Sequence, residues 1–159
     1  MSRPESDEGE PGDGIVPVPE TTRRVTRGAA RMFEDLGCAV VTEFVLANGR
    51  RADVAALSAD GRITLVEVKS GIPDFRSDGK WHEYLEFCDA FYFAVSPQFP
   101  RELLPDAGTC GLIVADPWEA VILRPAPVGT LAAARRKSVT VRLARVAALR
   151  LRALTDPRL

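Results

Sequence analysis

Three short segments rich in β-branched and apolar residues follow one another closely in the chain, at 39–46, 50–58 and 62–69. The connections Ala47-Asn48-Gly49 and Ala59-Asp60-Gly61 each suit a three-residue hairpin loop whose last residue is left-handed and therefore glycine. The pattern predicts an antiparallel β-meander. Because the loop lengths set the register, they also determine which side chains share a face of the sheet.

The register predicts a row of acidic side chains across the meander. A three-residue loop at 47–49 places Glu43 directly opposite Asp53, and a three-residue loop at 59–61 places Asp53 directly opposite Glu67. Directly opposed residues project from the same face, with Cβ atoms about 4.5–5.5 Å apart. Lys69 lies two positions beyond Glu67 and joins that face.

Carboxylates packed this closely repel one another unless a cation lies among them. Glu43, Asp53 and Glu67 are therefore candidate ligands for Mg²⁺, or for Mn²⁺, which prefers similar oxygen donors. Lys69 is a candidate to position or help deprotonate a water and to stabilise charge on a phosphate. The alternative is that the acids are solvated residues on an outer sheet face. Glu67 argues against this, because it lies in the apolar run ITLVEVK, where an unpartnered carboxylate is costly to bury.

Composition restricts the other kinds of chemistry. The chain has one histidine, His82, and three cysteines without a C-x-x-C pair, so neither a Cys/His zinc site nor a disulfide framework is expected. No apolar run is long enough to span a membrane, and the N-terminus is acidic where a signal peptide is basic. We therefore expect a cytoplasmic protein without a membrane partner.

Charge is strongly segregated along the chain despite a formal net charge of −1. Residues 1–20 are acidic and residues 124–159 are basic. We expect a disordered acidic tail at 1–19, a core domain at 20–124 and a basic C-terminal helix at 125–159 packed on the core.

The remaining elements follow from hydrophobic periodicity and from glycine and proline positions. An alternating strand at 138–146 competes with the long C-terminal helix, and the stretch SGIPDFRSDG is expected to be irregular. The predicted elements are a helix from a Thr21 or Thr22 cap to Leu36, a helix at 80–88 capped by Asp78 with Trp81, Leu85 and Cys88 inward, strands at 90–95, 111–115 and 120–123, and a helix at 131–154.

The sequence R-A-D-V around Asp53, followed by E-V-K at 67–69, resembles the PD-(D/E)xK motif of the restriction-endonuclease-like superfamily. More narrowly, LVEVKSGIPDFRSDGKWHEYLEFCDAFYFAV is similar to the MmcB family of bacterial DNA repair proteins. The resemblance implies an α/β fold with an αβββαβ core, a mixed central sheet flanked by helices. It also implies that Asp53 and Glu67 bind Mg²⁺, that Lys69 assists phosphodiester hydrolysis, and that Glu43 is the candidate to complete the site. Ala52 replaces the proline of the motif.

The implied function is metal-dependent hydrolysis of DNA in DNA repair. A non-catalytic DNA-binding or adaptor module that keeps the fold is the main alternative, and RNA is an alternative substrate. Many members of the superfamily dimerise, so a homodimer is a further candidate assembly, and other repair proteins are candidate partners.

Five residues outside the motif are candidates for DNA contact. Lys80 and Tyr84 lie one helical turn apart after the E-V-K strand, where the superfamily often places a residue that faces the site. The alternative for this pair is a solvated lysine and a tyrosine at a helix edge. Arg135, Arg142 and Arg145 belong to the basic end, which either neutralises phosphates or is a solvated helix face.

Overall fold

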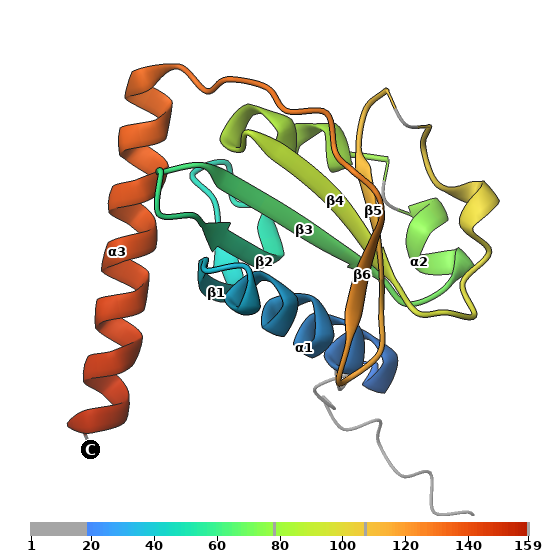
Figure 1. The fold of residues 1–159 in the computed structure, drawn as a ribbon. Coiled ribbons are helices and arrows are strands. Elements are labelled where there is room, and N and C mark those ends of the chain that lie inside the picture. The colour runs from blue at the N-terminus through green and yellow to red at the C-terminus, as the bar shows by residue number, and fades with distance from the viewer. Residues whose placement is uncertain (1–18, 78, 107, 159) are drawn as a thin grey trace, which may run out of the picture.

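The fold is a mixed α/β structure built on one six-stranded sheet with strand order β1-β2-β3-β4-β5-β6 (Figure 1). It is described by a computed structural model that covers residues 19–77, 79–106 and 108–158. The acidic tail predicted at 1–19, apart from Pro19, and the predicted Asp78 cap lie outside these residues. The elements are α1 (Glu20–Asp35), β1 (Ala39–Val45), β2 (Arg51–Leu57), β3 (Ile63–Lys69), α2 (Ile72–Ser77), the 3-10 helix η1 (Trp81–Phe87), β4 (Ala90–Val95), the 3-10 helix η2 (Arg101–Leu103), β5 (Gly111–Ala115), β6 (Ala120–Arg124) and α3 (Ala133–Thr155).

The β-meander has the register that its loop lengths predict. β1 and β2 are antiparallel with Thr42 opposite Val54, and β2 and β3 are antiparallel with Val54 opposite Val66. Gly49 and Gly61 both have φ of +85°, the left-handed conformation that the hairpin loops require. β3, β4 and β5 then continue as parallel neighbours, and β6 returns antiparallel to β5.

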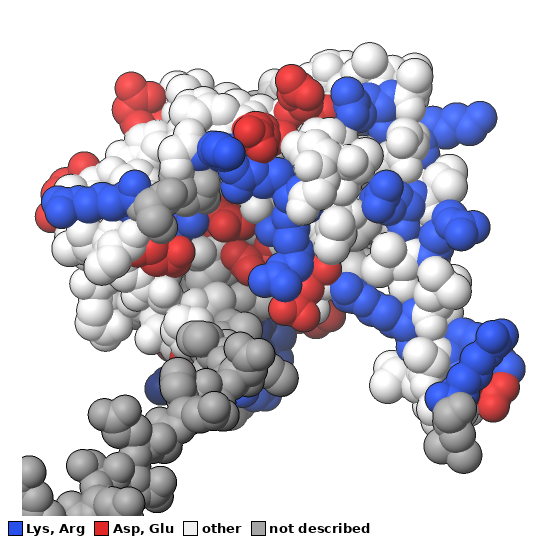
Figure 2. Space-filling view, turned by 180° about the vertical axis from the view of Figure 1, so that it is seen from behind, with Lys and Arg blue, Asp and Glu red and all other residues white. Residues whose placement is uncertain are grey.

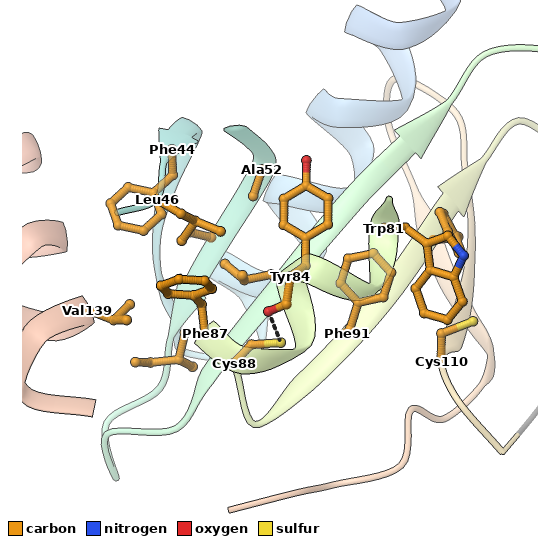
Figure 3. Close-up of a cluster of buried hydrophobic side chains, with 14 of the residues drawn as sticks. Phe44, Leu46, Ala52, Trp81, Tyr84, Phe87, Cys88, Phe91, Cys110 and Val139 are labelled. Atoms are coloured by element: carbon orange, nitrogen blue, oxygen red, sulfur yellow. Dashed lines mark hydrogen bonds between the residues drawn. The ribbon is translucent and has the colours of Figure 1, made fainter. Parts of the chain in front are cut away.

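Helices cover both faces of the sheet. On one face α1 buries Val25, Ala29 and Phe33 against a cluster that includes Val54 and Val66. On the other face η1 and α3 cover a second cluster, drawn in Figure 3. The sheet therefore lies between two apolar layers, which explains why β4 is buried along its whole length.

The long C-terminal segment is a helix and not a strand. α3 runs along the β1 side of the molecule (Figure 1) and buries Val139 and Leu143 in the second cluster. Its first turns are tied to the core by Arg136, whose guanidinium pairs with the buried Asp89 at 2.6 Å. Within the part of the chain that the structure describes, no helix combines the length and apolar character needed to span a membrane.

The connection between β3 and β4 differs most from expectation. Part of the stretch expected to be irregular forms α2, and the helix expected at 80–88 is a 3-10 helix. In a 3-10 helix residues three apart are aligned, so Trp81, Tyr84 and Phe87 are buried and Leu85 is 37% exposed. The expected threonine cap of the first helix is also wrong, because Pro19 occupies that position without a side-chain cap.

Candidate active site

Asp53 lies where β2 and β3 separate. The paired residues of these strands run from Leu57–Ile63 to Val54–Val66, and Asp53 and Glu67 follow at the next position. At that position the Asp53 carboxylate accepts a hydrogen bond from the Val68 backbone N–H at 2.7 Å. The side chain therefore replaces a strand carbonyl as hydrogen-bond acceptor, which holds Asp53 between the two strands.

Asp53 and Glu67 line the same pocket, a cavity of about 700 Å³ on the η1 face of the sheet. Lys80 and Tyr84 contribute to its wall from the segment that follows β3. The site thus brings together the two motif carboxylates and the two residues predicted to face them. The other lining residues are Val45, Asn48, Gly49, Arg50, Arg51 and Glu83.

Lys69 is buried beside this pocket, with 2% of its side chain exposed. Its Nζ lies 3.4 Å from Glu67 Oε1 and 3.9 Å from Asp74 Oδ1. Asp74 also accepts a hydrogen bond from the Ser70 backbone N–H at 3.1 Å, which fixes the start of α2 against the end of β3. A buried ammonium is held here by carboxylates on two elements, as a buried charge requires.

The pKa values of two groups are displaced by this environment. Burial raises the pKa of Asp53, and the Val68 hydrogen bond and the charge of Lys69 oppose that rise. Burial also raises the pKa of Tyr84, with the nearby Glu67 carboxylate as the next cause. The Tyr84 hydroxyl donates to the Arg51 carbonyl at 2.8 Å and points away from the apolar cluster around its ring (Figure 3). Tyr84 is consequently a neutral hydrogen-bonding group.

Glu43 departs from the predicted row of three acids. Its φ is +49°, which interrupts the alternation of side chains along β1. Phe44 consequently packs into the η1-side cluster, whereas Thr42, two residues earlier, lines a pocket with α1. The Glu43 side chain is 60% exposed, and Arg51 is 4.0 Å away. Glu43 therefore lies outside the pocket of Glu67, but it lines a second pocket, on the α1 side of the sheet, together with Asp53.

The carboxylates of the pocket fit a divalent cation. Among residues 19–77, 79–106 and 108–158, no group of three or more His, Cys, Asp or Glu side chains is placed to hold a metal ion. Asp53 and Glu67 nevertheless provide two carboxylates on one solvent-accessible pocket. Mg²⁺ is commonly held by one or two carboxylates, with waters and substrate phosphate completing the shell, so this donor set suits it.

The structure places the predicted DNA-contact residues in two regions. Lys80 and Tyr84 lie at the pocket, whereas the three arginines lie on α3. Arg142 donates to the Val45 carbonyl at 3.4 Å, and the Arg135 guanidinium lies 4.4 Å from the centre of the Phe87 ring. Arg145 is exposed.

Several pocket residues were not singled out from the sequence as site residues, among them Asn48, Arg50 and Glu83. The Arg50 Nε bonds Glu83 at 2.8 Å, and its guanidinium lies 5.8 Å from the centre of the Tyr84 ring. The Asn48 side chain approaches the Glu83 carbonyl at 3.4 Å. The sequence could have identified Asn48 and Arg50 as neighbours of the site. They lie in or beside the hairpin loop just before Asp53 and hence near the same sheet edge.

The fold and pocket define a mixed α/β protein with carboxylates and a buried lysine at the separation of two strands. A family model described as "DNA repair protein MmcB-like" matches residues 13–158. The chain therefore belongs to the MmcB-like family of DNA repair proteins.

A solved structure supports the same fold. The SPO1766 protein of unknown function from Silicibacter pomeroyi has a TM-score of 0.82 and 46% sequence identity. The match covers 87% of this chain and 93% of that protein. Among curated proteins, no match was found.

Proposed function

We propose that this protein hydrolyses DNA phosphodiesters in DNA repair, using a metal-dependent site of the PD-(D/E)xK type. The observation that carries the proposal is the pocket that Asp53 and Glu67 share, with the Lys69 ammonium 3.4 Å from Glu67. Membership of a DNA repair family supports DNA as the substrate. The order of α1, the β-meander and the parallel β4 supports a restriction-endonuclease-like core.

In this proposal Asp53 and Glu67 hold the cation. Mg²⁺ or Mn²⁺, when bound, supplies a Lewis acid that polarises a phosphate oxygen and lowers the pKa of water. Lys69 pairs with Glu67 and orients it, and its ammonium assists the attacking water or stabilises negative charge on the phosphate. Lys80 and Arg51 add positive charge to the pocket wall, which favours a phosphate there.

The test is cleavage of a panel of single-stranded, duplex and branched DNA, with an RNA strand included, in Mg²⁺ or Mn²⁺. We expect Asp53→Asn, Glu67→Gln and Lys69→Met each to reduce cleavage at least about 100-fold, because each removes a charge that the reaction needs. Asn at position 53 can still accept the Val68 hydrogen bond, so the loss reports the charge and not the fold.

Glu102→Gln is the matched control, because this carboxylate is exposed and lines neither of the two cavities that contain Asp53. We expect it to change cleavage less than about threefold, within the range of a surface substitution. A loss as large as that of Asp53→Asn would show that the variants do not report on the site.

A non-catalytic DNA-binding role is the second candidate. What favours it is that the matching family is described by DNA repair and not by hydrolysis. If wild-type protein binds the panel substrates and cuts none of them, hydrolysis is rejected and the adaptor role is retained.

A further inference from the structure

Trp118 is a large apolar side chain at the surface, in a turn whose backbone is fixed by hydrogen bonds. It lies in the tight turn between β5 and β6, where the Asp116 carboxylate accepts the backbone N–H groups of Trp118 and Glu119 at 2.7 and 2.8 Å. The Asp116 N–H in turn donates to the Glu119 carbonyl at 2.9 Å. Trp118 is nevertheless 65% exposed. The turn therefore fixes the backbone of Trp118 and presents its aromatic ring to solvent.

The turn is also fixed relative to α1, which it reaches in Figure 1. A Cβ built at Gly28 would lie only 1.9 Å from the Asp116 carbonyl oxygen. Only a glycine allows this approach of the turn to the helix. The distance between Trp118 and the outer face of α1 is thus set by backbone contact.

The outer face of α1 is basic beside this ring. The Arg27 guanidinium lies 4.8 Å and that of Arg31 5.9 Å from the centre of the Trp118 ring. Between Glu20 and Glu34 the helix contains no acidic residue. The exposed arginines of this stretch are Arg23, Arg24, Arg27 and Arg31.

This basic surface is continuous with the candidate active site. Arg23 and Arg27 line a cavity of about 350 Å³ together with Trp118. The same two arginines line a second cavity, of about 340 Å³, together with Asp53. Asp53 is accessible from both sides of the sheet because it lies at the separation of β2 and β3. Arg23 and Arg27 therefore line both cavities between Trp118 and Asp53, with Glu20 also in the first and Glu43 also in the second.

We propose that Trp118 and the α1 arginines bind a single strand of DNA and lead it to the carboxylate site. The arginines neutralise phosphates, and an unpaired base stacks on Trp118. Strand-tracking proteins combine a positive surface with aromatic side chains, and stacking requires a base that is not enclosed in a duplex. This inference rests on the proposed function, because it takes DNA as the ligand of that site.

The experiment measures binding of a fluorescein-labelled oligodeoxythymidylate of roughly 15 nucleotides, by anisotropy, in EDTA. Without divalent cations the binding does not depend on cleavage. We expect the single strand to bind at least tenfold more tightly than a duplex of equal length. Trp118→Leu should weaken single-strand binding roughly tenfold, since stacking on one aromatic residue contributes on this scale. Trp118→Phe, which keeps an aromatic face, should reduce the affinity less.

Charge is tested separately from stacking. Arg27→Gln combined with Arg31→Gln should weaken single-strand binding and lower its salt dependence. Arg62→Gln is the matched control, because this arginine lies in the β2–β3 hairpin loop and lines neither arginine cavity. It should leave the affinity within about twofold of wild type.

The outcomes separate this inference from the proposed hydrolysis. Equal binding of single strand and duplex, or unchanged binding by Trp118→Leu, overturns the single-strand surface even if the protein cleaves DNA. Weaker binding by Trp118→Leu and by the double arginine variant supports the surface even if no panel substrate is cut. Salt-dependent binding that Trp118→Leu leaves intact would instead indicate a surface that attracts any polyanion, and would reject the stacking role.

Discussion

At the scale of single residues, Asp53 connects the fold to the candidate site. Its carboxylate accepts the Val68 N–H that an unbroken β2 would have satisfied with a carbonyl. The same residue therefore lies where the two strands separate and exposes a carboxylate to the pocket. Gly28 has a comparable role on the opposite face, because the lack of a side chain lets the β5–β6 turn rest on α1.

Gly28→Ala tests the close approach of that turn. Helix propensity alone predicts a gain of about 1 kcal/mol, since alanine is the better helix former. The structure predicts the opposite sign, a decrease of about 1–3 kcal/mol in the free energy of unfolding, because the new Cβ would overlap the Asp116 carbonyl. Urea unfolding of wild type and Gly28→Ala decides between the predicted gain and the predicted loss of stability. A stabilised variant would show that the turn does not pack on α1 as described.

At the scale of elements, α3 covers the β1 edge of the sheet. The Arg150 guanidinium donates to the Thr42 carbonyl at 2.6 Å and to the Glu43 carbonyl at 3.1 Å, and Arg142 donates to the Val45 carbonyl. Edge strands expose unpaired backbone groups that promote association with other chains, and covering them prevents it. Arg142 and Arg150 therefore contribute to the fold, irrespective of any contact with DNA.

The start of α3 depends on Asp89, which is 5% exposed. Its carboxylate accepts hydrogen bonds from the Arg136 guanidinium and from the Ile63 and Leu131 backbone N–H groups. We expect Asp89→Asn to lower the free energy of unfolding at pH 7 by about 2–3 kcal/mol, because it removes charge-assisted hydrogen bonds. Asp156→Asn, at the exposed end of α3, is the control and should have little effect.

The pH dependence of this difference follows from the same contacts. The hydrogen bond from Arg136 lowers the pKa of Asp89 from 3.8 to about 2. A carboxyl group with a lowered pKa in the folded state stabilises the protein above its unfolded pKa, and this contribution disappears as the pH falls through the folded pKa. The difference between wild type and Asp89→Asn should therefore shrink between about pH 4 and pH 2. If denaturation experiments gave the same difference in free energy of unfolding throughout this pH range, the pairing of Asp89 with Arg136 would be contradicted.

At the scale of the whole molecule, acidic and basic side chains are segregated on the surface. One face carries acidic side chains near its centre, with Lys and Arg beside them and along α3 (Figure 2). Such an arrangement suits a polyanion that crosses the protein while one phosphate approaches a cation held by carboxylates. The near-neutral net charge thus conceals two regions of opposite sign.

The role of α3 in DNA binding is tested by salt dependence. If Arg135 and Arg145 neutralise duplex phosphates, replacing both by Gln should reduce the slope of log affinity against log salt by about 0.9 for each phosphate that is no longer neutralised. Arg142→Gln is the comparison, because this side chain already donates to the Val45 carbonyl. We expect it to change the slope less. A double variant with the wild-type slope would exclude α3 from the DNA-binding surface.

Much of the fold could be predicted from local signals. Gly49 and Gly61 mark turns that only a left-handed residue completes, so the meander and its register follow from loop length. Helix and strand periodicity likewise located α1, β4, β5, β6 and α3. The 3-10 geometry of η1 could not be predicted, because Trp81, Tyr84 and Phe87 are aligned only once their rings pack against β4.

Local sequence was sufficient to place Asp53 and Glu67 on neighbouring strands with Lys69 close by, since register is a local property of short loops. The position of Glu43 outside this pocket depends on long-range packing, because the left-handed conformation of this edge-strand residue accompanies the burial of Phe44 in the core. The contact of Trp118 with the α1 arginines also arises from tertiary packing. It joins segments about 90 residues apart, and no local pattern specifies which helix face a distant turn will meet.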